Sequence, residues 1–162
     1  MSISAAMNAK LNEQITAEFS AAHSYLTMSA SLEKMGLKVL AKRFLDQHEE
    51  ERGHGLKIFK YVQDVGGEVA LDAVAKPKSG YKSVEAIAQA ALDSEQEVTR
   101  LIHELVALAD KEKDYSTRSF LGWFVDEQVE EVASMTDLLR LVRLAGKDLL
   151  EVETRVRHEM QN

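Results

Sequence analysis

Long helical stretches constrain this chain more than any other feature of its sequence. Apolar residues recur with a helical period through four long segments, and the single proline, Pro77, lies outside all of them. Glycines typical of helix ends follow three of these segments, at Gly36, Gly66 and Gly146, and the Ser83 hydroxyl can cap the start of the third segment. A shorter amphipathic segment comes last. We therefore expect five helices, at about residues 5–35, 38–65, 83–111, 115–145 and 148–159.

The lengths of the connections predict how these helices pack. The joints at Gly36 and at residues 111–115 are short, so the first two helices and the next two should form antiparallel pairs. The stretch at 66–82 has no helical period, and about 17 extended residues reach roughly 55 Å, more than the roughly 42 Å of a 28-residue helix. It can therefore cross the whole bundle and make the second and third helices parallel. We predict an all-α four-helix bundle with one long crossover loop and a short fifth C-terminal helix, formed by residues 1–162 as a single domain.

Composition excludes several kinds of partner and site. The net charge of −7 argues against nucleic acid as a partner, because phosphate binding needs a basic surface. The same acid excess can serve solubility or attract cations. The chain has no cysteine, which excludes disulfides, thiolate zinc sites and iron–sulfur clusters. Residues 1–14 lack the apolar core of a secretory signal, and no stretch approaches the roughly 20 apolar residues of a membrane span, so we expect a cytoplasmic protein with no membrane partner.

A glutamate interrupts the middle of each predicted inward stripe of apolar residues, at Glu18, Glu51, Glu95 and Glu131. Four carboxylates in a bundle core would repel one another, and no lysine or arginine lies in the stripes near those levels. A pair of divalent metal ions supplies about four positive charges and accepts carboxylate and imidazole ligands. The alternative is that the stripes are misphased and these glutamates face water, as most glutamates do. For any single glutamate that alternative is the stronger, but it accounts poorly for all four together.

The sharpest motif is Glu51-x-x-His54. A spacing of three places both side chains on one helical face, one turn apart, where they can hold a single ion. Alone the motif is weak, because such pairs are common on solvated helix faces, but Glu18 and Glu95 at the same level strengthen it. The lack of further histidines in the stripes favours iron or manganese held by carboxylates over a structural zinc site.

The sequence resembles the ferritin family, specifically the bacterial non-haem ferritins, over nearly its whole length. The residues that carry the resemblance are Glu18 with Tyr25, Glu50-Glu51-Arg52-Gly53-His54, Glu95-Gln96, and the run from Trp123 to Glu131. The resemblance implies the ferritin-like form of the four-helix bundle. It also implies a ferroxidase that oxidises Fe(II) with O2 or H2O2 and stores the ferric mineral inside a shell of 24 copies of the chain.

The resemblance assigns residues to a di-iron ferroxidase centre within one subunit. Glu18, Glu51 and His54 would bind the first iron. Glu51 would bridge to a second iron held by Glu95, with Gln128 as a nearby polar contact.

It also implies a third iron site toward the inside of the shell. Glu50, Glu127 and Glu130 match its ligands, and Glu131, a further ligand of the second iron, would be shared between the second and third irons. Glu127 and Glu130 lie one position off the core stripe, so the alternative is that they only line an inner surface and help to nucleate mineral.

Two aromatic residues, Tyr25 and Trp123, match residues beside the family's iron centre. Either could give up an electron during oxygen reduction, and packing in the core is the alternative for both.

Differences from related families narrow the expected cofactor and function further. Haem-binding bacterioferritins have a second Glu-x-x-His on the fourth helix, where this chain has Glu127 followed by Glu130, and a haem-ligating methionine where it has Arg52. No haem is therefore expected. The main alternative function is a di-metal four-helix-bundle oxidoreductase acting on a small organic substrate, although the chain has no insertion to build a substrate pocket. A structural shell protein with degenerate metal binding is a further alternative, which the complete ligand set disfavours.

Overall fold

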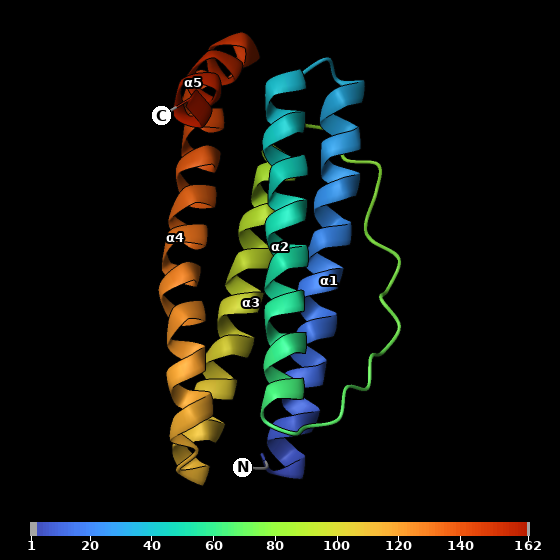
Figure 1. The fold of residues 1–162 in the computed structure, drawn as a ribbon. Helices are drawn as coiled ribbons and strands as arrows, with labels where there is room; N and C mark the ends of the chain where they lie inside the picture. Colours follow the sequence, from blue (N-terminus) through green and yellow to red (C-terminus); the bar gives the residue numbers. More distant parts are fainter. Residues whose placement is uncertain (1–2, 162) are drawn as a thin grey trace.

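A computed structural model of the protein describes residues 3–161, which form five α-helices and one long crossover (Figure 1). The helices are α1 (Ala5–Lys34), α2 (Lys38–Asp64), α3 (Val84–Glu112), α4 (Tyr115–Ala145) and α5 (Leu149–Gln161). The predicted all-α bundle with a short fifth helix is confirmed. Within the described residues, none of the helices is both long and apolar enough to cross a membrane.

Side-chain caps and left-handed glycines mark the ends of the long helices. Ser4, Ser83 and Asp114 each accept a hydrogen bond from the backbone N–H three residues later, at 2.9, 3.0 and 3.0 Å, at the starts of α1, α3 and α4. The turns after α1, α2 and α4 contain Gly36, Gly66 and Gly146, which have φ values of 83°, 74° and 58°. A residue without a Cβ adopts this left-handed backbone at little cost, so these positions end the helices.

The start of α2 is capped by a residue from α5. Its own N-cap residue, Leu37, has no side chain that can accept a hydrogen bond. Instead Glu153 of α5 accepts hydrogen bonds from the backbone N–H groups of Val39 and Leu40, at 3.1 and 2.7 Å. The buried Glu153 carboxylate thus satisfies two otherwise unpaired donors and holds α5 against the end of the bundle.

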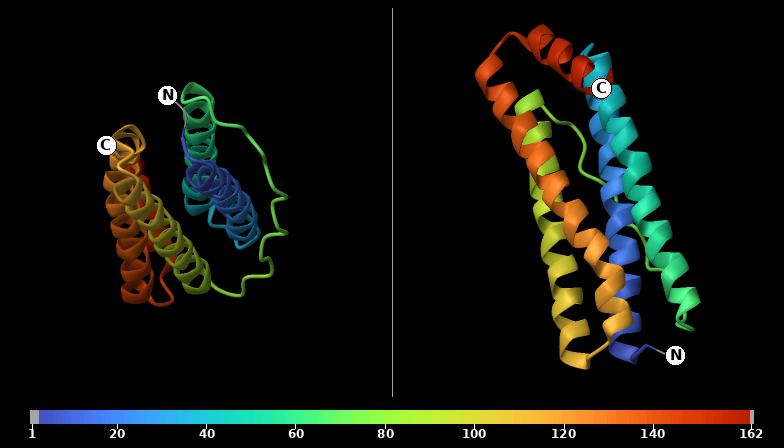
Figure 2. Two further views of the ribbon diagram at one scale, coloured as in Figure 1. Left: turned by 90° about the horizontal axis from the view of Figure 1, so that it is seen from below. Right: turned by 60° about the vertical axis from the view of Figure 1, so that its left-hand side comes forward.

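The crossover determines the topology. Helices α1 and α2 form one antiparallel hairpin, and α3 and α4 form another. Residues 65–83 climb the outside of the bundle from the end of α2 to the opposite end, where α3 begins (Figures 1 and 2). Helices α2 and α3 therefore run parallel, as in the single-crossover class of four-helix bundle.

Two asparagines of α1 hold the first part of the crossover. The Asn8 side chain accepts from Glu68 N at 2.9 Å and donates to Glu68 O at 3.1 Å. Asn12 donates to the same carbonyl at 2.9 Å and accepts from Ala70 N at 2.8 Å. These bonds replace the strand or helix partners that the irregular backbone lacks, and they set its direction along α1.

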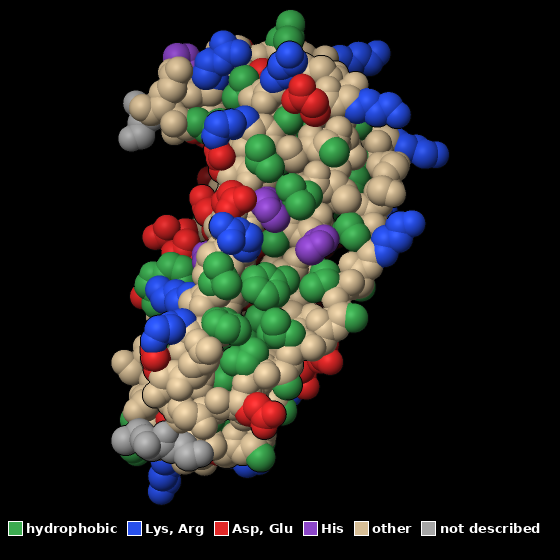
Figure 3. Space-filling model, turned by 45° about the vertical axis from the view of Figure 1, so that its right-hand side comes forward, with side chains coloured by type: hydrophobic (Ala, Val, Ile, Leu, Met, Phe, Trp, Pro, Cys, Tyr) green, Lys and Arg blue, Asp and Glu red, His purple; other side chains and the backbone are tan. Residues whose placement is uncertain are grey.

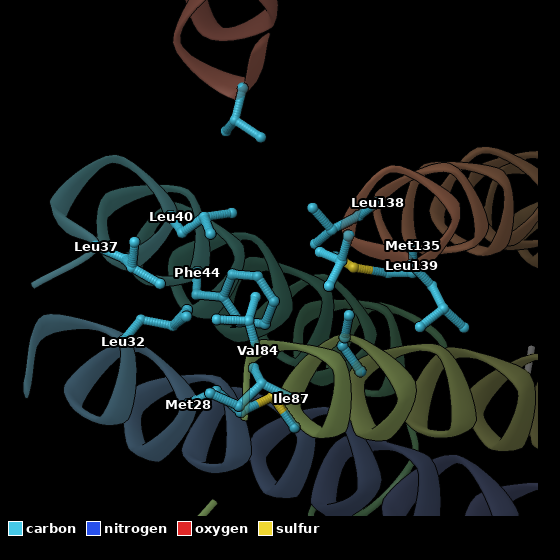
Figure 4. Close-up of a cluster of buried hydrophobic side chains, with 14 of the residues drawn as sticks. Met28, Leu32, Leu37, Leu40, Phe44, Val84, Ile87, Met135, Leu138 and Leu139 are labelled. Atoms are coloured by element: carbon cyan, nitrogen blue, oxygen red, sulfur yellow. The ribbon is translucent and has the colours of Figure 1, made fainter. Parts of the chain in front are cut away.

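The apolar core is divided into two clusters, one toward each end of the bundle. Figure 4 shows the cluster nearer α5, with side chains such as Leu32 of α1, Phe44 of α2, Ile87 of α3 and Met135 of α4 facing one another. Most buried polar side chains lie in a band between the two clusters. The members of this central band are Gln14, Glu18, Gln47, Glu51, His54, Glu95, Gln128 and Glu131.

Candidate metal centre

Each of the four long helices contributes one glutamate to the central band. Glu18 of α1, Glu51 of α2 and Glu95 of α3 are fully buried, and Glu131 of α4 is 6% exposed. Apolar side chains on the same face of each helix pack above and below these glutamates, so the helices cannot rotate the carboxylates to water without exposing core residues. Other groups within the site must therefore offset the free-energy cost of burying these carboxylates.

Potential ligand atoms converge in three groups, each with all its atoms within 4.8 Å of one another. The first group is Glu18, Glu51 and His54, and the second is Glu51, Glu95 and Glu131. The third is His54, Glu127 and Glu131. Glu51 belongs to the first two groups and therefore links them.

His54 lies at the edge of this centre and is held on two sides. Its Nδ1 lies 3.1 Å from Glu51 Oε2, one helical turn earlier. Its ring packs edge-on against Trp123 and Phe124 of α4, with centroid distances of 5.4 and 6.1 Å. The other nitrogen, Nε2, lies 4.0 Å from Glu127 Oε1, so the imidazole stands between the Glu51 and Glu127 carboxylates. Trp123 is 39% exposed, and the Lys57 ammonium lies 3.3 Å from its ring centroid.

Glu95 receives hydrogen bonds from two neighbouring helices. The Tyr25 hydroxyl of α1 donates to Glu95 Oε1. Gln128 Nε2 of α4 lies 3.2 Å from both Glu95 Oε2 and Thr99 Oγ1. Tyr25 is itself buried and packs edge-on against Phe44, with ring centroids 5.6 Å apart. Both side chains therefore fix the orientation of one carboxylate.

Two further glutamines, Gln14 and Gln47, contact the central carboxylates, and sequence reasoning did not select either as a site residue. Gln14 Nε2 donates to Glu18 Oε1 at 2.9 Å, and Gln47 Nε2 donates to Glu131 Oε2 at 2.8 Å. Each stands four residues before a central glutamate of its own helix, a spacing that was visible in the sequence.

Glu18 has one carboxylate oxygen without a protein partner. Among the residues that the structure describes, Glu18 Oε2 is the one buried side-chain oxygen or nitrogen that lacks a hydrogen bond. A buried acceptor without a donor is costly, and it is explained where a cation belongs beside it. The orphan oxygen and the converging ligands therefore fit a metal ion.

The central carboxyls differ in their electrostatic state. Burial raises the pKa of Glu95 to about 8 and that of Glu131 to about 9, and neighbouring carboxylate charges add to both shifts. Burial raises the pKa of Glu18 well above its ordinary value as well. Burial acts against the ionised form of Glu51 too, but the hydrogen bond and the charge of His54 outweigh it, and the Glu51 pKa is lowered. Without metal, burial thus favours the protonated forms of Glu18, Glu95 and Glu131, while His54 favours the ionised form of Glu51.

An acidic groove opens beside the centre, between α2 and α4. It has a volume of about 530 Å³. Its lining residues are the acids Asp46, Glu50, Glu127, Glu130 and Glu131, together with Gln47, Arg43, Ser134 and Met160. Figure 3 shows acidic side chains gathered around a hollow below the end of α5. Glu127 belongs to one of the three ligand groups, whereas the exposed Glu50 and Glu130 belong to none of them.

Comparisons with known proteins find a matching family, similar sequences and similar solved structures. Residues 8–145 match the family model described as a ferritin-like domain. Bacterial non-heme ferritins of Staphylococcus aureus (strain MRSA252) and Staphylococcus saprophyticus are 41% and 40% identical to this chain over 138 residues, which is 85% of this chain and 83% of theirs. A solved structure of an open pore ferritin from the hyperthermophilic archaeon Archaeoglobus fulgidus superposes with a TM-score of 0.93 at 41% identity, covering 95% of this chain and 96% of that one.

Proposed function

The chain belongs to the ferritin family and is an iron-storage protein with ferroxidase activity, and we propose that it oxidises Fe(II) at the central band of the bundle. The observation that carries this proposal is the convergence of four buried glutamates and His54 into ligand groups joined by Glu51. Iron is the substrate here: it binds as Fe(II), is oxidised and is then stored.

The two halves of the centre would hold one iron each. Glu18, Glu51 and His54 bind the first iron, and Glu51 bridges to a second iron bound by Glu95 and Glu131. The 4.8 Å limit within each ligand group and the orphan oxygen of Glu18 support this assignment. Carboxylates suit the reaction because they stabilise the higher charge of ferric iron and shift between terminal and bridging positions.

The electron balance requires both irons. Each Fe(II) gives one electron, so O2 takes two electrons and two protons to become H2O2, or H2O2 takes two of each to become water. Tyr25 and Gln128 would act on this step through Glu95, because both donate hydrogen bonds to its carboxylate. Tyr25 is also close enough to the centre to supply a further electron.

The ferric product would leave through the acidic groove. We propose a third iron site there, with Glu50, Glu127 and Glu130 as ligands and Glu131 shared with the second iron. The groove supports this route because Glu131 lines it and also belongs to the inner ligand group.

Ferritins assemble into oligomeric shells, and we propose 24 copies for this chain. Exposed leucines on α1, α2 and the crossover support contact with a second copy: Leu26, Leu45, Leu56 and Leu71 are 38–54% exposed. Hydrophobic side chains gather on this face in Figure 3. We also propose that all 162 residues form one domain, because Val152 and Val156 of α5 are buried in the same cluster as residues of α1 to α4.

Mixing the metal-free protein with Fe(II) without oxygen and then admitting O2 tests the function. We expect a fast rise in diferric absorbance, followed by retention of many irons per oligomer. Glu18→Ala and His54→Ala should slow the fast phase by more than the roughly 10- to 100-fold typical of losing an outer-shell partner, because each removes a ligand. The control is Glu13→Ala, an exposed change on the same helix as Glu18. An unchanged fast phase in either ligand variant would show that the assignment of this centre is wrong.

A further inference from the structure

Glu131 stands at the boundary between the metal centre and the acidic groove. It belongs to two ligand groups, one with Glu51 and Glu95 inside the bundle and one with His54 and Glu127 toward the groove. Both groups are formed in the same conformation, so the Glu131 carboxylate is shared between them. A contact that draws this carboxylate toward Glu51 would favour the inner group.

Gln47 is placed to do this. Its Nε2 lies 2.8 Å from Glu131 Oε2 and 3.2 Å from Glu51 Oε1. A side-chain amide nitrogen has two hydrogens, so both bonds can form together. The first bond crosses from α2 to α4. Gln47 lines the acidic groove together with Glu131 and is 8% exposed, so its amide stands at the same boundary as the carboxylate it contacts.

The chemistry of an amide suits this role better than that of a charged residue. A lysine at this position would neutralise the carboxylates in place of a metal ion, and a glutamate would add to their repulsion. A glutamine holds one oxygen of Glu131 by a neutral donor and leaves the other oxygen for a metal ion.

Gln14 provides the comparison within the same centre. It also donates to one oxygen of a central carboxylate, Glu18, but that contact is between residues four apart on one helix. Glu18 belongs to a single ligand group, so Gln14 orients a carboxylate that serves only one site. The contact across helices to a shared carboxylate is particular to Gln47.

From this geometry we propose that Gln47 is a positioning residue that holds Glu131 on the inner side of the centre. It thereby strengthens binding of the second iron and delays transfer of the carboxylate, and of ferric iron with it, to the groove. This inference rests on the ligand assignment under the proposed function.

The test uses Co(II), which binds such ligands without being oxidised in the absence of oxygen, titrated into the assembled protein and followed by its visible absorption bands. In Gln47→Met, which keeps the side-chain length but removes the donor, we expect the second Co(II) to bind about 10- to 100-fold more weakly. The first Co(II), held by Glu18, Glu51 and His54, should be weakened less, because Gln47 lies 3.2 Å from Glu51 Oε1 but 2.8 Å from Glu131 Oε2. With iron and oxygen, the diferric absorbance should decay faster than in the unaltered protein.

Two controls separate positioning from packing. Gln63→Met makes the same change at an exposed position of α2 and should alter neither Co(II) step. Glu131→Ala should weaken the second Co(II), and adding Gln47→Met to it should weaken binding no further, because the group through which Gln47 acts is gone.

The outcomes also separate this inference from the ligand assignment. If Glu131→Ala weakens the second Co(II) but Gln47→Met does not, the role of Gln47 is wrong and the assignment stands. If the two changes add in the double variant, Gln47 acts through another group, which also overturns the inference. If Glu131→Ala itself has no effect, Glu131 is not a ligand and the proposed centre is wrong in this half.

Discussion

At the scale of single residues, the central band tolerates four buried carboxyls without metal because most of them keep a proton. Glu95 and Glu131 have pKa values of about 8 and about 9, so both are largely neutral at pH 7. Gln14, Gln47 and Gln128 add neutral donors to the same carboxyls. The sequence predicted metal because four buried carboxylates would repel one another. Protons and amide donors relieve this repulsion until metal ions displace the protons.

The raised pKa of Glu131 gives the stability of the metal-free protein a defined pH dependence. In the unfolded chain this carboxyl titrates near 4.5 and in the folded protein near 9, so the folded state binds the extra proton between these values. The stabilising contribution is complete below about pH 4.5 and is lost as the pH rises through about 9. We expect the Tm of the metal-free protein to fall over this range, and to fall less steeply in Glu131→Gln. Thermal unfolding followed by circular dichroism checks this, and equal slopes in the two proteins would contradict it.

At the scale of elements, α2 depends on its neighbours both at its start, which Glu153 caps, and near its middle. Two glycines near its middle, Gly53 and Gly55, have opposite surroundings. A Cβ on Gly55 would lie 2.6 Å from the Phe19 ring of α1, whereas one on Gly53 would have no atom within 4 Å. Gly55 therefore permits the close approach of α1 and α2 next to His54, and Gly53 has no such packing role.

This contrast predicts opposite effects for two alanine substitutions. Gly53→Ala should stabilise the protein by about 0.5–1 kcal/mol, because alanine favours the helix and meets no obstacle. Gly55→Ala should destabilise it by about 1–3 kcal/mol, because the Phe19 ring must move. Chemical denaturation of both variants gives the comparison. Similar gains in both would mean that Phe19 adapts freely and that the close approach has no energetic importance.

The helical period of the sequence predicts which side chains of each helix face inward. Contacts between side chains of different helices could not be predicted from it. The apolar stripes turn Glu18, Glu51 and Glu95 inward, and the cap at Ser83 depends only on residues close to it in the chain. The hydrogen bonds from Gln47 to Glu131 and from Leu40 to Glu153 join residues 84 and 113 positions apart. Such pairs depend on how two helices are rotated and shifted against each other, which no period within one helix specifies.

At the scale of the whole molecule, the metal centre joins the two helix hairpins between two separate apolar clusters. Glu51 comes from the α1–α2 hairpin, and Glu95 and Glu131 come from the α3–α4 hairpin. Ions bound between them add connections at the level where the bundle has the fewest apolar contacts. Metal should therefore stabilise the bundle as a whole.

Thermal unfolding with and without Co(II), in the absence of oxygen, measures this effect. At a free concentration of about one hundred times Kd, each site should add about 2.7 kcal/mol to the free energy of unfolding. Glu51→Gln should lose most of the gain, because Glu51 belongs to two ligand groups. Glu18→Gln should lose only the part due to the first site. An equal gain in the unaltered protein and in Glu51→Gln would show that the ions bind elsewhere.

The hydrogen bonds from Val39 and Leu40 to Glu153 also bear on how the chain is made. Helix α5 leaves the ribosome more than one hundred residues after the start of α2. During synthesis the first turn of α2 therefore stays without this cap until α5 has emerged and docked. A chain cut short before α5 would keep these two backbone donors without their protein partner, so this end of the bundle is finished only after α5 has been made.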